Sequence, residues 1–302
     1  MELIGKTSID FIGKRKIAFI ISSIIAILGI TGVIQVARSA ANMGIDFTGG
    51  TVVQMKFTNP VHTDQARGAL DKHNLKGANL QDIKEGNKLL IKVGKTNLAV
   101  GKVADTIEDI FRKEFPGNSF IMESSTEIGP SVGDKLRKDT LIAVAISMLG
   151  IIIYIAWRFD YKFGIGAIVA TLHDVLAMFA VFFLFNKEIN LLFITAVLTV
   201  AGYSLTDTVV VFDRIRENLH KNLKEALPTV FNKSINEVLS RTIVTSLTAF
   251  LAALSLFFFG GEVIHDFAFA LVVGIAVGTY SSIFVASPIV VVLENRTYQS
   301  KA

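Results

Sequence analysis

A carboxylate stands inside a segment of the sequence that is apolar enough to cross a lipid bilayer. Asp207 belongs to the run from Leu191 to Phe212, and the charged sequence DRIREN follows directly at residues 213–218. An ionised carboxylate near the centre of a bilayer costs about 2.5–3.5 kcal/mol on insertion scales. Such a group needs a partner, a water path or a neutral form, so Asp207 is a candidate proton or ion site.

Hydroxyl groups recur along the same segment. Thr195, Thr199, Tyr203 and Asp207 follow one another at intervals of four residues and are expected to form one polar stripe on a helix. Two interpretations are open: the carboxylate holds neighbouring helices in register through hydrogen bonds, or it carries a proton. The second is favoured, because a carboxyl balanced between desolvation and a nearby cation can load and release a proton near neutral pH.

Arg241 is the candidate partner of this carboxylate. It opens the next apolar run, and Thr245 and Thr248 follow on the same side of the expected helix. In an up-and-down bundle one span ends and the next begins at the same membrane surface, so Asp207 and Arg241 can lie at similar depth. The alternative is that Arg241 extends its charged group to the membrane surface and has no partner in the bundle.

His173 and Asp174 form a second ionisable pair within an apolar run. A histidine titrates near physiological pH, and the adjacent carboxylate can orient it or relay protons. Neighbouring residues of a helix do not share a face, so at least one of the two is expected to face the interior of the bundle. A proton relay and a structural role are both open for this pair.

A cluster of charged residues follows the run that contains Asp207. Asp213, Arg214, Arg216 and Glu217 are expected to form a solvated, self-paired helix end, with Asp213 and Arg214 as further candidates for the relay. The sequence has no pattern typical of a metal site, a catalytic triad, a phosphate-binding loop or a nucleic-acid-binding surface. No metal, cofactor or nucleic-acid partner is therefore expected.

Composition indicates the class of protein that must position these residues. The chain has 302 residues, 51% of them hydrophobic, with a mean hydropathy of +0.54 and no cysteine, which excludes disulfides. About 20 apolar residues span a bilayer, so the hydropathy predicts an α-helical polytopic membrane protein. Six transmembrane helices are predicted, at residues 17–36, 141–157, 163–185, 191–212, 242–259 and 267–293. The first run exceeds the roughly 7–15 residues of a signal-peptide core and is expected to be a retained anchor.

The basic residues predict the orientation of these spans. On one side of the bundle, the short connections contain a single basic residue, Lys187, beside Glu188. Because basic loops stay in the cytoplasm, both termini are expected to be cytoplasmic, and the segment 38–138 is expected outside. The basic residues of the cytoplasmic side are Lys6, Lys14, Arg15, Lys16, Arg158, Lys162, Arg214, Arg216, Lys221, Lys224, Lys233, Arg296 and Lys301.

The segment 38–138 is predicted to be a folded outer domain. Its order β-α-β-β-α-β is typical of a ferredoxin-like α+β domain, here placed between the first and second transmembrane helices. The domains expected are thus 1–37, 38–138 and 139–302. A turn at Gly49-Gly50 precedes the first strand, and a turn with Gly86-Asn87 joins the second and third. The predicted strands are 51–57, 78–83, 88–93 and 119–123, and the predicted helices are 62–74 and 98–115.

Small residues recur every four positions along the sixth span. Such a stripe predicts the close approach of another helix in lipid and has no chemical role of its own. The residues are Ala270, Gly274, Gly278, Ser282 and Ala286.

Five motifs give the chain a resemblance to the SecD/SecF family of accessory subunits of the bacterial protein translocase. The longest and most specific is GYSLTDTVVVFDRIREN at residues 202–218, where Thr206 replaces a common asparagine. Over nearly its whole length the chain resembles the smaller of the two paired subunits. The other motifs are IDFIGKRK at 9–16, GIDFTGGT at 44–51, IGPSVGDKL at 128–136 and SRTIVTSLT at 240–248.

The resemblance implies an RND-superfamily fold, in which six helices pair with those of SecD to complete a twelve-helix unit. It implies docking on SecYEG in the bacterial inner membrane, with YajC as a further accessory subunit and preproteins as substrate. It also implies that proton flow through Asp207 and Arg241 drives motions of the outer domains, while Asp213, Arg214 and Arg216 support a cytoplasmic gate. Nothing in the sequence resembles an ATPase, so the chain is not expected to be an enzyme.

Two other functions remain open at this point. A small-molecule permease of the RND superfamily usually carries two large outer domains and twelve spans in one chain. This chain is predicted to have one outer domain of about 100 residues and six spans. A scaffold of the translocon without titration is the third hypothesis, and in it Asp207 is purely structural.

Overall fold

The computed structural model of the chain describes residues 5, 7–38, 40–83, 86–94, 96, 101–221 and 225–299. The chain forms two compact units, residues 1–42 with 143–302 and residues 43–142. We call them the helical unit and the α+β unit. Leu98, near the predicted start of an outer helix, lies outside the described residues, as do Lys6, Lys224 and Lys301 of the orientation argument.

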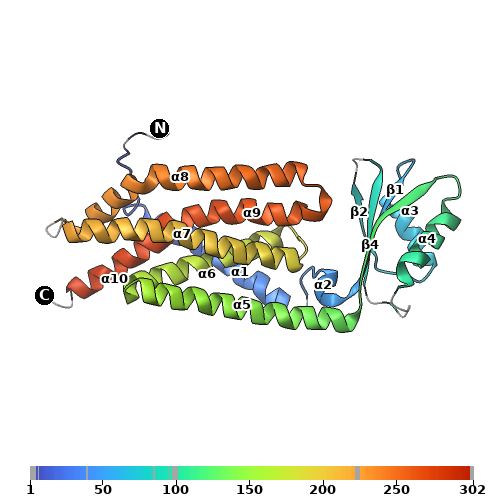
Figure 1. Ribbon diagram of the computed structural model, residues 1–302, viewed down its shortest axis with the longest axis horizontal. Helices are drawn as coiled ribbons and strands as arrows, with labels where there is room; N and C mark the ends of the chain where they lie inside the picture. The colour runs from blue at the N-terminus through green and yellow to red at the C-terminus, as the bar shows by residue number, and fades with distance from the viewer. Residues whose placement is uncertain are drawn as a thin grey trace. The chain divides into compact units, whose positions relative to one another are not determined.

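Six stretches in the described part of the chain are long and apolar enough to cross a membrane, as predicted. Their helices run alongside one another in the helical unit, with α7, α8 and α9 as neighbours (Figure 1). The sixth stretch combines α9, the π-helical segment η1 and α10. The elements are α1 (Arg15–Ala37), α5 (Pro130–Arg158), α6 (Tyr161–Leu184), α7 (Leu191–Lys221), α8 (Leu227–Phe259), α9 (Glu262–Ser281), η1 (Ser282–Ala286) and α10 (Ser287–Gln299).

Three of the helices are longer than the predicted spans. α5 begins at Pro130 rather than at Leu141, α7 continues from the apolar run to Lys221, and α8 begins at Leu227 rather than at Thr242. Hydropathy marks only the part of a helix that suits hydrocarbon. The added turns of α7 and α8 are polar and are held by contacts between these two helices, which single-sequence patterns do not reveal.

The small-residue stripe of the sixth span faces α7, which confirms the predicted close packing. A Cβ atom added at Gly274 would lie 2.5 Å from a methyl carbon of Val200, and one at Gly278 would lie 2.9 Å from the Cβ of Ser204. The regular spacing ends at η1, where the helix widens to π geometry, a form often found at functional sites.

Glycine also permits the contact between α1 and α6. A Cβ at Gly29 would lie 2.2 Å from the Leu176 carbonyl oxygen, and one at Gly32 would lie 3.0 Å from that of Phe179. α5 is different, because its apolar side chains are largely exposed, Leu141, Ile146, Leu149 and Ile153 among them.

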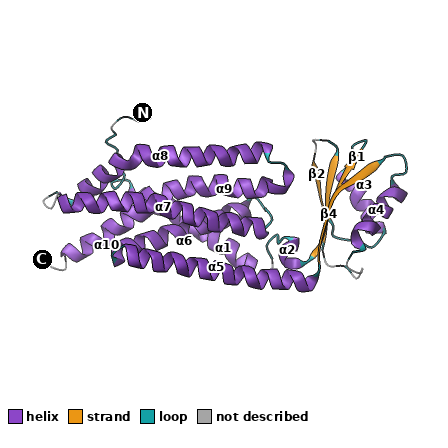
Figure 2. Ribbon diagram, in the orientation of Figure 1, coloured by secondary structure: helices purple, strands orange, loops and turns teal. Residues whose placement is uncertain are grey.

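The α+β unit is a four-stranded antiparallel sheet with two helices on one face (Figure 2). Val53, Met55 and Phe57 alternate with less buried residues along β1 and pack with Ile107 and Phe111 of α4. The sheet order is β2-β3-β1-β4. The elements are α2 (Ile45–Thr48), β1 (Gly50–Phe57), α3 (Thr63–Lys72), β2 (Asn79–Ile83), β3 (Lys88–Val93), α4 (Val103–Glu114) and β4 (Phe120–Ile128).

The predicted turns lie where the chain needs glycine or asparagine. Gly49 and Gly50 have φ values of 71° and 143°, and a Cβ at Gly49 would lie 3.1 Å from the Cα of Pro130. Gly86 and Asn87 also have positive φ, which suits a tight strand connection. The short helix α2 was not predicted.

The contact between α1 and α6 yields a first prediction. Gly29→Ala places a methyl group against the Leu176 carbonyl and forces the helices apart, which costs about 1–3 kcal/mol. Gly150→Ala on α5 is the matched control, because nothing lies within 4 Å of its Cβ position. We expect a lower melting temperature in detergent for the first variant and not for the second. Equal melting temperatures would contradict the described packing.

The sheet yields a pH prediction. Lys88 Nζ and Gln54 Nε2 donate to Glu123 at 2.8 and 2.7 Å, and these bonds, chiefly that from Lys88, hold the pKa of Glu123 below its ordinary value of 4.5. A depressed pKa stabilises the fold fully above pH 4.5 and loses that effect as the pH falls through the lowered value. Glu123→Gln should therefore lower the melting temperature of the α+β unit at neutral pH, and the difference should shrink in acid. Unfolding of this unit can be measured in the intact chain by the temperature at which a protease cleaves within residues 43–142. If the melting temperatures of the wild-type chain and the variant differ by the same amount at every pH, the prediction is wrong.

Candidate functional site

α7 and α8 enclose the Asp207 side chain, which is 6% exposed. Ser246 of α8 donates its hydroxyl to Asp207 Oδ2 at 3.0 Å. Thr208 and Thr242 are buried as well, and the Thr242 hydroxyl has no hydrogen-bond partner among the described residues. A buried carboxyl group thus faces hydroxyls of α8, from Ser246 and Thr245, and the Arg241 charge, an environment in which its charged and neutral forms differ in energy.

The predicted polar stripe does not form one network with Asp207. Thr195 and Thr199 are exposed, and their hydroxyls donate to the carbonyls of Leu191 and Thr195 at 2.9 and 2.8 Å. A spacing of four residues advances about 40° beyond a full turn, so the stripe winds around the helix. Its last two members reach the α7–α8 interface: the buried Tyr203 hydroxyl lies beside Ser246 and Thr245 of α8, next to the Asp207 carboxyl.

Arg241 and Asp207 are not paired in this structure. Arg241 is exposed on α8, and within the part of the chain that is described no ion pair joins it to a carboxylate. It lies five positions before Ser246, on the helix that contacts Asp207. The predicted proximity is found: no direct ion pair forms among the described residues, but the Arg241 charge acts on the Asp207 carboxyl.

Asp174 is a second buried acid, with no exposed surface. Its Oδ2 accepts hydrogen bonds from Ser204 of α7 at 2.5 Å and from Ser281 of α9 at 2.8 Å. The carboxylate thereby joins α6, α7 and α9 just before η1 begins. Ser204 and Asp207 are three residues apart on α7, so this helix contributes to both buried carboxyl sites.

His173 is buried beside Asp174, with Nδ1 at 3.2 Å from Asp174 Oδ1. Its Nε2 has no hydrogen-bond partner among the described residues. The ring lies 6.1 Å from that of Tyr280, whose hydroxyl donates to the Ala18 carbonyl of α1. Both residues of the pair are buried because α6 packs against α1 as well as against α7 and α9.

The polar end of α7 is held by two neighbouring helices. Arg158 of α5 donates to both oxygens of Asp213, at 2.8 and 2.6 Å, and Arg214 pairs with Glu217 and with Glu237 of α8, both at 2.6 Å. The expectation that these charges pair only within the end of α7 is therefore incomplete. Asp213 connects α7 to α5, and Arg214 connects α7 to α8 as well as pairing with Glu217 on its own helix.

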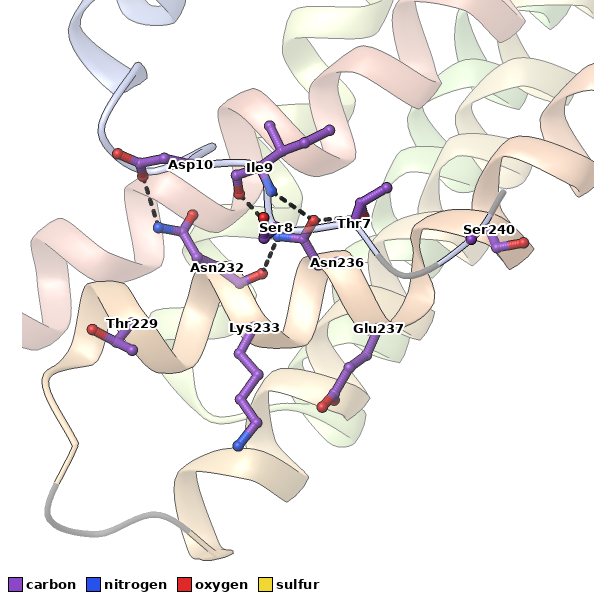
Figure 3. Close-up of a pocket in the computed structure, with 11 residues that line it drawn as sticks. Thr7, Ser8, Ile9, Asp10, Thr229, Asn232, Lys233, Asn236, Glu237 and Ser240 are labelled. Carbon is purple, nitrogen blue, oxygen red and sulfur yellow. Dashed lines mark hydrogen bonds between the residues drawn. The ribbon is translucent and has the colours of Figure 1, made fainter. Parts of the chain in front are cut away.

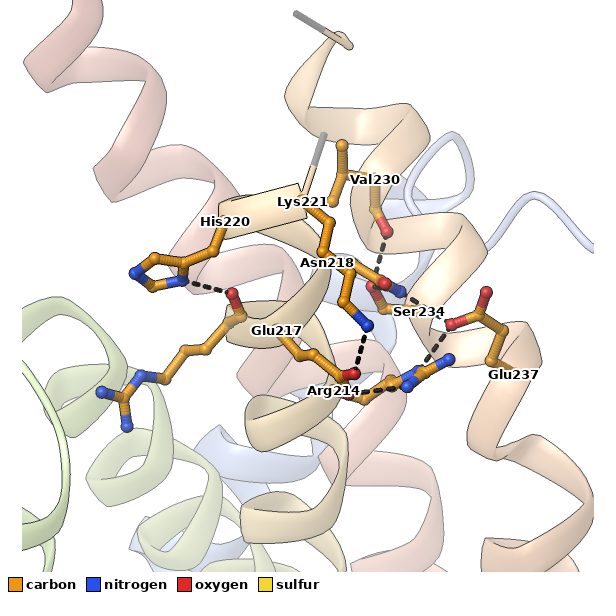
Figure 4. A network of polar contacts seen from close by, with 9 residues as sticks. Arg214, Glu217, Asn218, His220, Lys221, Val230, Ser234 and Glu237 are labelled. Carbon is orange, nitrogen blue, oxygen red and sulfur yellow. Dashed lines mark hydrogen bonds and ion pairs between the residues drawn. The ribbon is translucent and has the colours of Figure 1, made fainter. Parts of the chain in front are cut away.

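A buried polar contact supports this arrangement (Figure 4). Asn218 donates to Ser234 Oγ at 3.0 Å and to Glu237 Oε2 at 2.7 Å, and Ser234 donates to the Val230 carbonyl at 2.7 Å. Glu237 thus accepts from Arg214 and Asn218 at once, which stabilises the α7–α8 pair at its polar end.

Sequence reasoning missed most of the partner residues. Ser204, Ser246 and Ser281 carried no sign beyond being small polar residues within apolar runs, a composition known at helix contacts in membranes. Asn218 closes the charged run 213–218, whereas Glu237 lies in the turns of α8 that precede the predicted span. No group of three or more histidine or acidic residues in the described ranges could hold a metal ion.

The family comparison covers most of the chain. The family described as "Protein export membrane protein SecD/SecF, C-terminal" matches residues 106–296, and the "SecD/SecF GG Motif" matches residues 41–61. The chain is similar to the protein translocase subunit SecF of Thermodesulfovibrio yellowstonii, with 53% identity over 295 residues and 97% of both chains covered. The subunit of that name from Calditerrivibrio nitroreducens is 42% identical over 299 residues, with 98% of this chain and 97% of the relative covered.

Solved structures agree with this assignment. A crystal structure of SecDF from Thermus thermophilus, described as a translocon-associated membrane protein, matches with a TM-score of 0.85 and 34% identity. The match covers 96% of this chain and 39% of that one, so the present chain spans about two-fifths of the SecDF chain. SecDF in a super-membrane-facing form matches with a TM-score of 0.71 and 35% identity, over 100% of this chain and 41% of that chain.

The fold and its buried ionisable groups define a polytopic helical membrane protein of the transport class. Within that class, the chain belongs to the SecD/SecF family of protein-export membrane proteins.

The Asp174 site yields a prediction. Asp174→Ala leaves the buried Ser204 hydroxyl without its acceptor, which costs about 1–3 kcal/mol, and removes the bond from Ser281, whose hydroxyl keeps the Gly278 carbonyl as acceptor. Asp139→Ala on α5 removes the same group from an exposed position and serves as control. We expect a lower melting temperature in detergent for the first variant alone. A wild-type melting temperature for Asp174→Ala would contradict a role in joining the three helices.

Proposed function

We propose that the chain acts with SecD in the bacterial inner membrane and uses the proton-motive force to assist preprotein movement through SecYEG and release from it. The buried Asp207, hydrogen-bonded to Ser246 of the neighbouring helix with Thr245 and Arg241 close by, carries this proposal. Gain or loss of a proton there changes the polarity of the α7–α8 contact. Family membership supports the role in protein export.

The energies are sufficient for such a motor. A proton crossing the membrane releases about 2.3 kcal/mol per 100 mV. A difference of about 1.4 kcal/mol changes the ratio of two arrangements tenfold. Titration of Asp207 therefore needs to capture only part of the available energy to bias the helices, and through them the outer domain, between two positions.

Arg241 is proposed as the counter-charge of Asp207 within the assembled complex. It is exposed in the isolated chain, on a part of α8 predicted to lie at the membrane. An exposed arginine at that depth is costly in lipid. A partner that covers this face would bring Arg241 into a protein environment beside the α7–α8 contact.

We infer that SecD covers this face of α7 and α8. Apart from Arg241, the exposed residues of this face have small side chains or hydroxyls bonded to their own helix. Another helix can therefore approach the backbones of α7 and α8 closely, which favours helix association in lipid. The exposed residues are Thr195, Thr199, Gly202 and Thr206 of α7 and Arg241, Thr245, Thr248 and Ala252 of α8.

The α+β unit is proposed to be a ferredoxin-like outer domain, residues 38–138, between the first and second transmembrane helices. Its order β-α-β-β-α-β and its antiparallel sheet β2-β3-β1-β4 support this. With this domain outside, both termini lie in the cytoplasm, and Asp213 and Arg214 lie at the cytoplasmic gate. YajC is proposed separately as a further accessory partner.

Removal of titration at Asp207 tests the motor. Asp207→Asn keeps the size of the side chain and its bond with Ser246 but cannot bind and release a proton. We expect normal co-purification with SecD and loss of the gradient-dependent part of export in proteoliposomes that contain SecD and SecYEG. Export without a gradient should not change.

The scaffold hypothesis predicts a different result for the same variant. If Asp207→Asn assembles with SecD and still responds to an imposed proton gradient, the carboxyl is structural and the relay is refuted.

A second experiment tests the proposed SecD face. Gly202→Leu on α7 adds bulk where nothing lies within 4 Å of the Cβ position, so the chain's own fold is not disturbed. Gly150→Leu on α5 adds the same bulk at an equally open position and is the matched control. We expect Gly202→Leu to reduce co-purification with SecD several-fold and Gly150→Leu to leave it unchanged. Equal recovery of SecD by both variants would place the interface elsewhere.

A further inference from the structure

Two asparagine side chains, one turn apart on α8, hold the segment that precedes α1 (Figure 3). We call residues 7–13 the strap. Asn236 Oδ1 accepts from the Ile9 amide at 2.9 Å and from the Thr7 hydroxyl at 2.6 Å, and its Nδ2 donates to the Ile9 carbonyl at 2.9 Å. Binding of both backbone groups of one residue resembles pairing with a neighbouring strand.

Asn232 binds the next part of the strap. Its Oδ1 accepts from the amides of Phe11 and Ile12 at 2.9 and 3.0 Å, and its Nδ2 donates to Asp10 Oδ1 at 2.7 Å. The Gly13 amide also donates to Asp10, at 2.8 Å. The bonds from Gly13 and Asn232 lower the pKa of Asp10, so the carboxylate remains an acceptor in mild acid.

Apolar contacts fix the far end of the strap. Phe11 and Ile12 are 5% and 1% exposed and belong to the core of the helical unit. The Phe11 ring meets that of Phe284 in η1 edge to face, with centroids 5.6 Å apart. The strap is therefore a built connection between the start of α1 and the polar end of α8, whose bonds act chiefly on its backbone.

α1 links the strap to the α+β unit, because the chain runs from the strap through α1 into residues 43–142. Two covalent connections join the helical unit to the α+β unit, one after α1 and one through α5. α1 packs tightly on α6 along Gly29, whereas the apolar side chains of α5 are largely exposed. On α8, Ser246 lies about 15 Å along the helix from Asn236. One rigid helix thus contacts both Asp207 and the strap.

We propose that Asn232 and Asn236 are positioning residues that couple displacement of α8 to α1, and through α1 to residues 43–142. The proposal rests on the function proposed above, in which titration of Asp207 displaces α8. It adds the route by which that displacement leaves the proton site. Asn232 and Asn236 bond to the strap's backbone and to the Asp10 carboxylate. We therefore expect this connection between α8 and the strap, the tie, to persist throughout the cycle rather than to form and break.

The test uses a double variant and a chemical repair. Asn232→Ala with Asn236→Ala removes the amide bonds to the strap. We expect SecD binding and export without a gradient to persist, and gradient-stimulated export to fall about tenfold. Lys233→Ala is the matched control, because Lys233 lies between the two asparagines and lines the same cavity of about 660 Å³ without a hydrogen bond to the strap.

A chemical crosslink between the strap and α8 distinguishes loss of coupling from misfolding of the double variant. The chain has no cysteine, so Ser8→Cys and Ser240→Cys, which line this cavity, can be joined by a short bismaleimide in the double-alanine background. The crosslink should restore gradient-stimulated export to near the wild-type level. Full activity of the uncrosslinked double variant overturns the proposal, and so does failure of a complete crosslink to restore it.

Failure of the underlying function gives a separate signature. If the wild-type complex shows no response to a proton gradient, the motor itself is refuted. Hydrogen exchange at the Ile9, Phe11 and Ile12 amides then still tests the tie. These amides should exchange slowly in the wild-type chain and at least tenfold faster in the double variant, and equal rates overturn the proposal whatever the export assay shows.

Discussion

The hydrogen bond from the Ser246 hydroxyl to the Asp207 carboxylate joins α7 to α8 in the apolar part of the helical unit. A hydroxyl can donate to a carboxylate, and it can accept from a protonated carboxyl. The contact therefore persists in both states, while its charge and strength change. A hydroxyl partner of this kind lets the acid alternate between its charged and neutral forms.

The second buried acid illustrates the contrast. Asp174 accepts from serines of two other helices and lies beside His173, so three helices depend on its present arrangement. Asp207 and Ser204, the latter bonded to Asp174, lie three residues apart on α7. This helix therefore has a fixed contact on one side and an adaptable one on the other. In the proposed route, movement at the α7–α8 contact is passed along α8 to the strap, which Asn232 and Asn236 attach to this helix.

The parts of the structure that the sequence predicted are those that follow from local physics. The six apolar runs, the strand Lys88–Val93 and the packing of Gly274 and Gly278 were all visible as periodicity or composition. The family assignment is confirmed by the comparisons, since long motifs such as residues 202–218 carry it. The polar turns of α7 and α8 beyond the membrane were missed because tertiary contacts stabilise them.

The candidate site was only partly predictable for a similar reason. Asp207 and Asp174 stood out because a carboxylate is rare among apolar residues, whereas Ser246, Ser204 and Ser281 are ordinary in such runs. Arg241 was expected beside Asp207; its charge acts on that carboxyl, but the side chain is exposed and makes no direct ion pair with it among the described residues. Infrared difference spectroscopy of the wild-type complex and its Asp207→Asn variant measures protonation of this carboxyl itself. A protonated-carboxyl band should appear as the pH is lowered and be missing from the variant; spectra of the two proteins that do not differ at any pH that preserves the fold would show that Asp207 does not titrate.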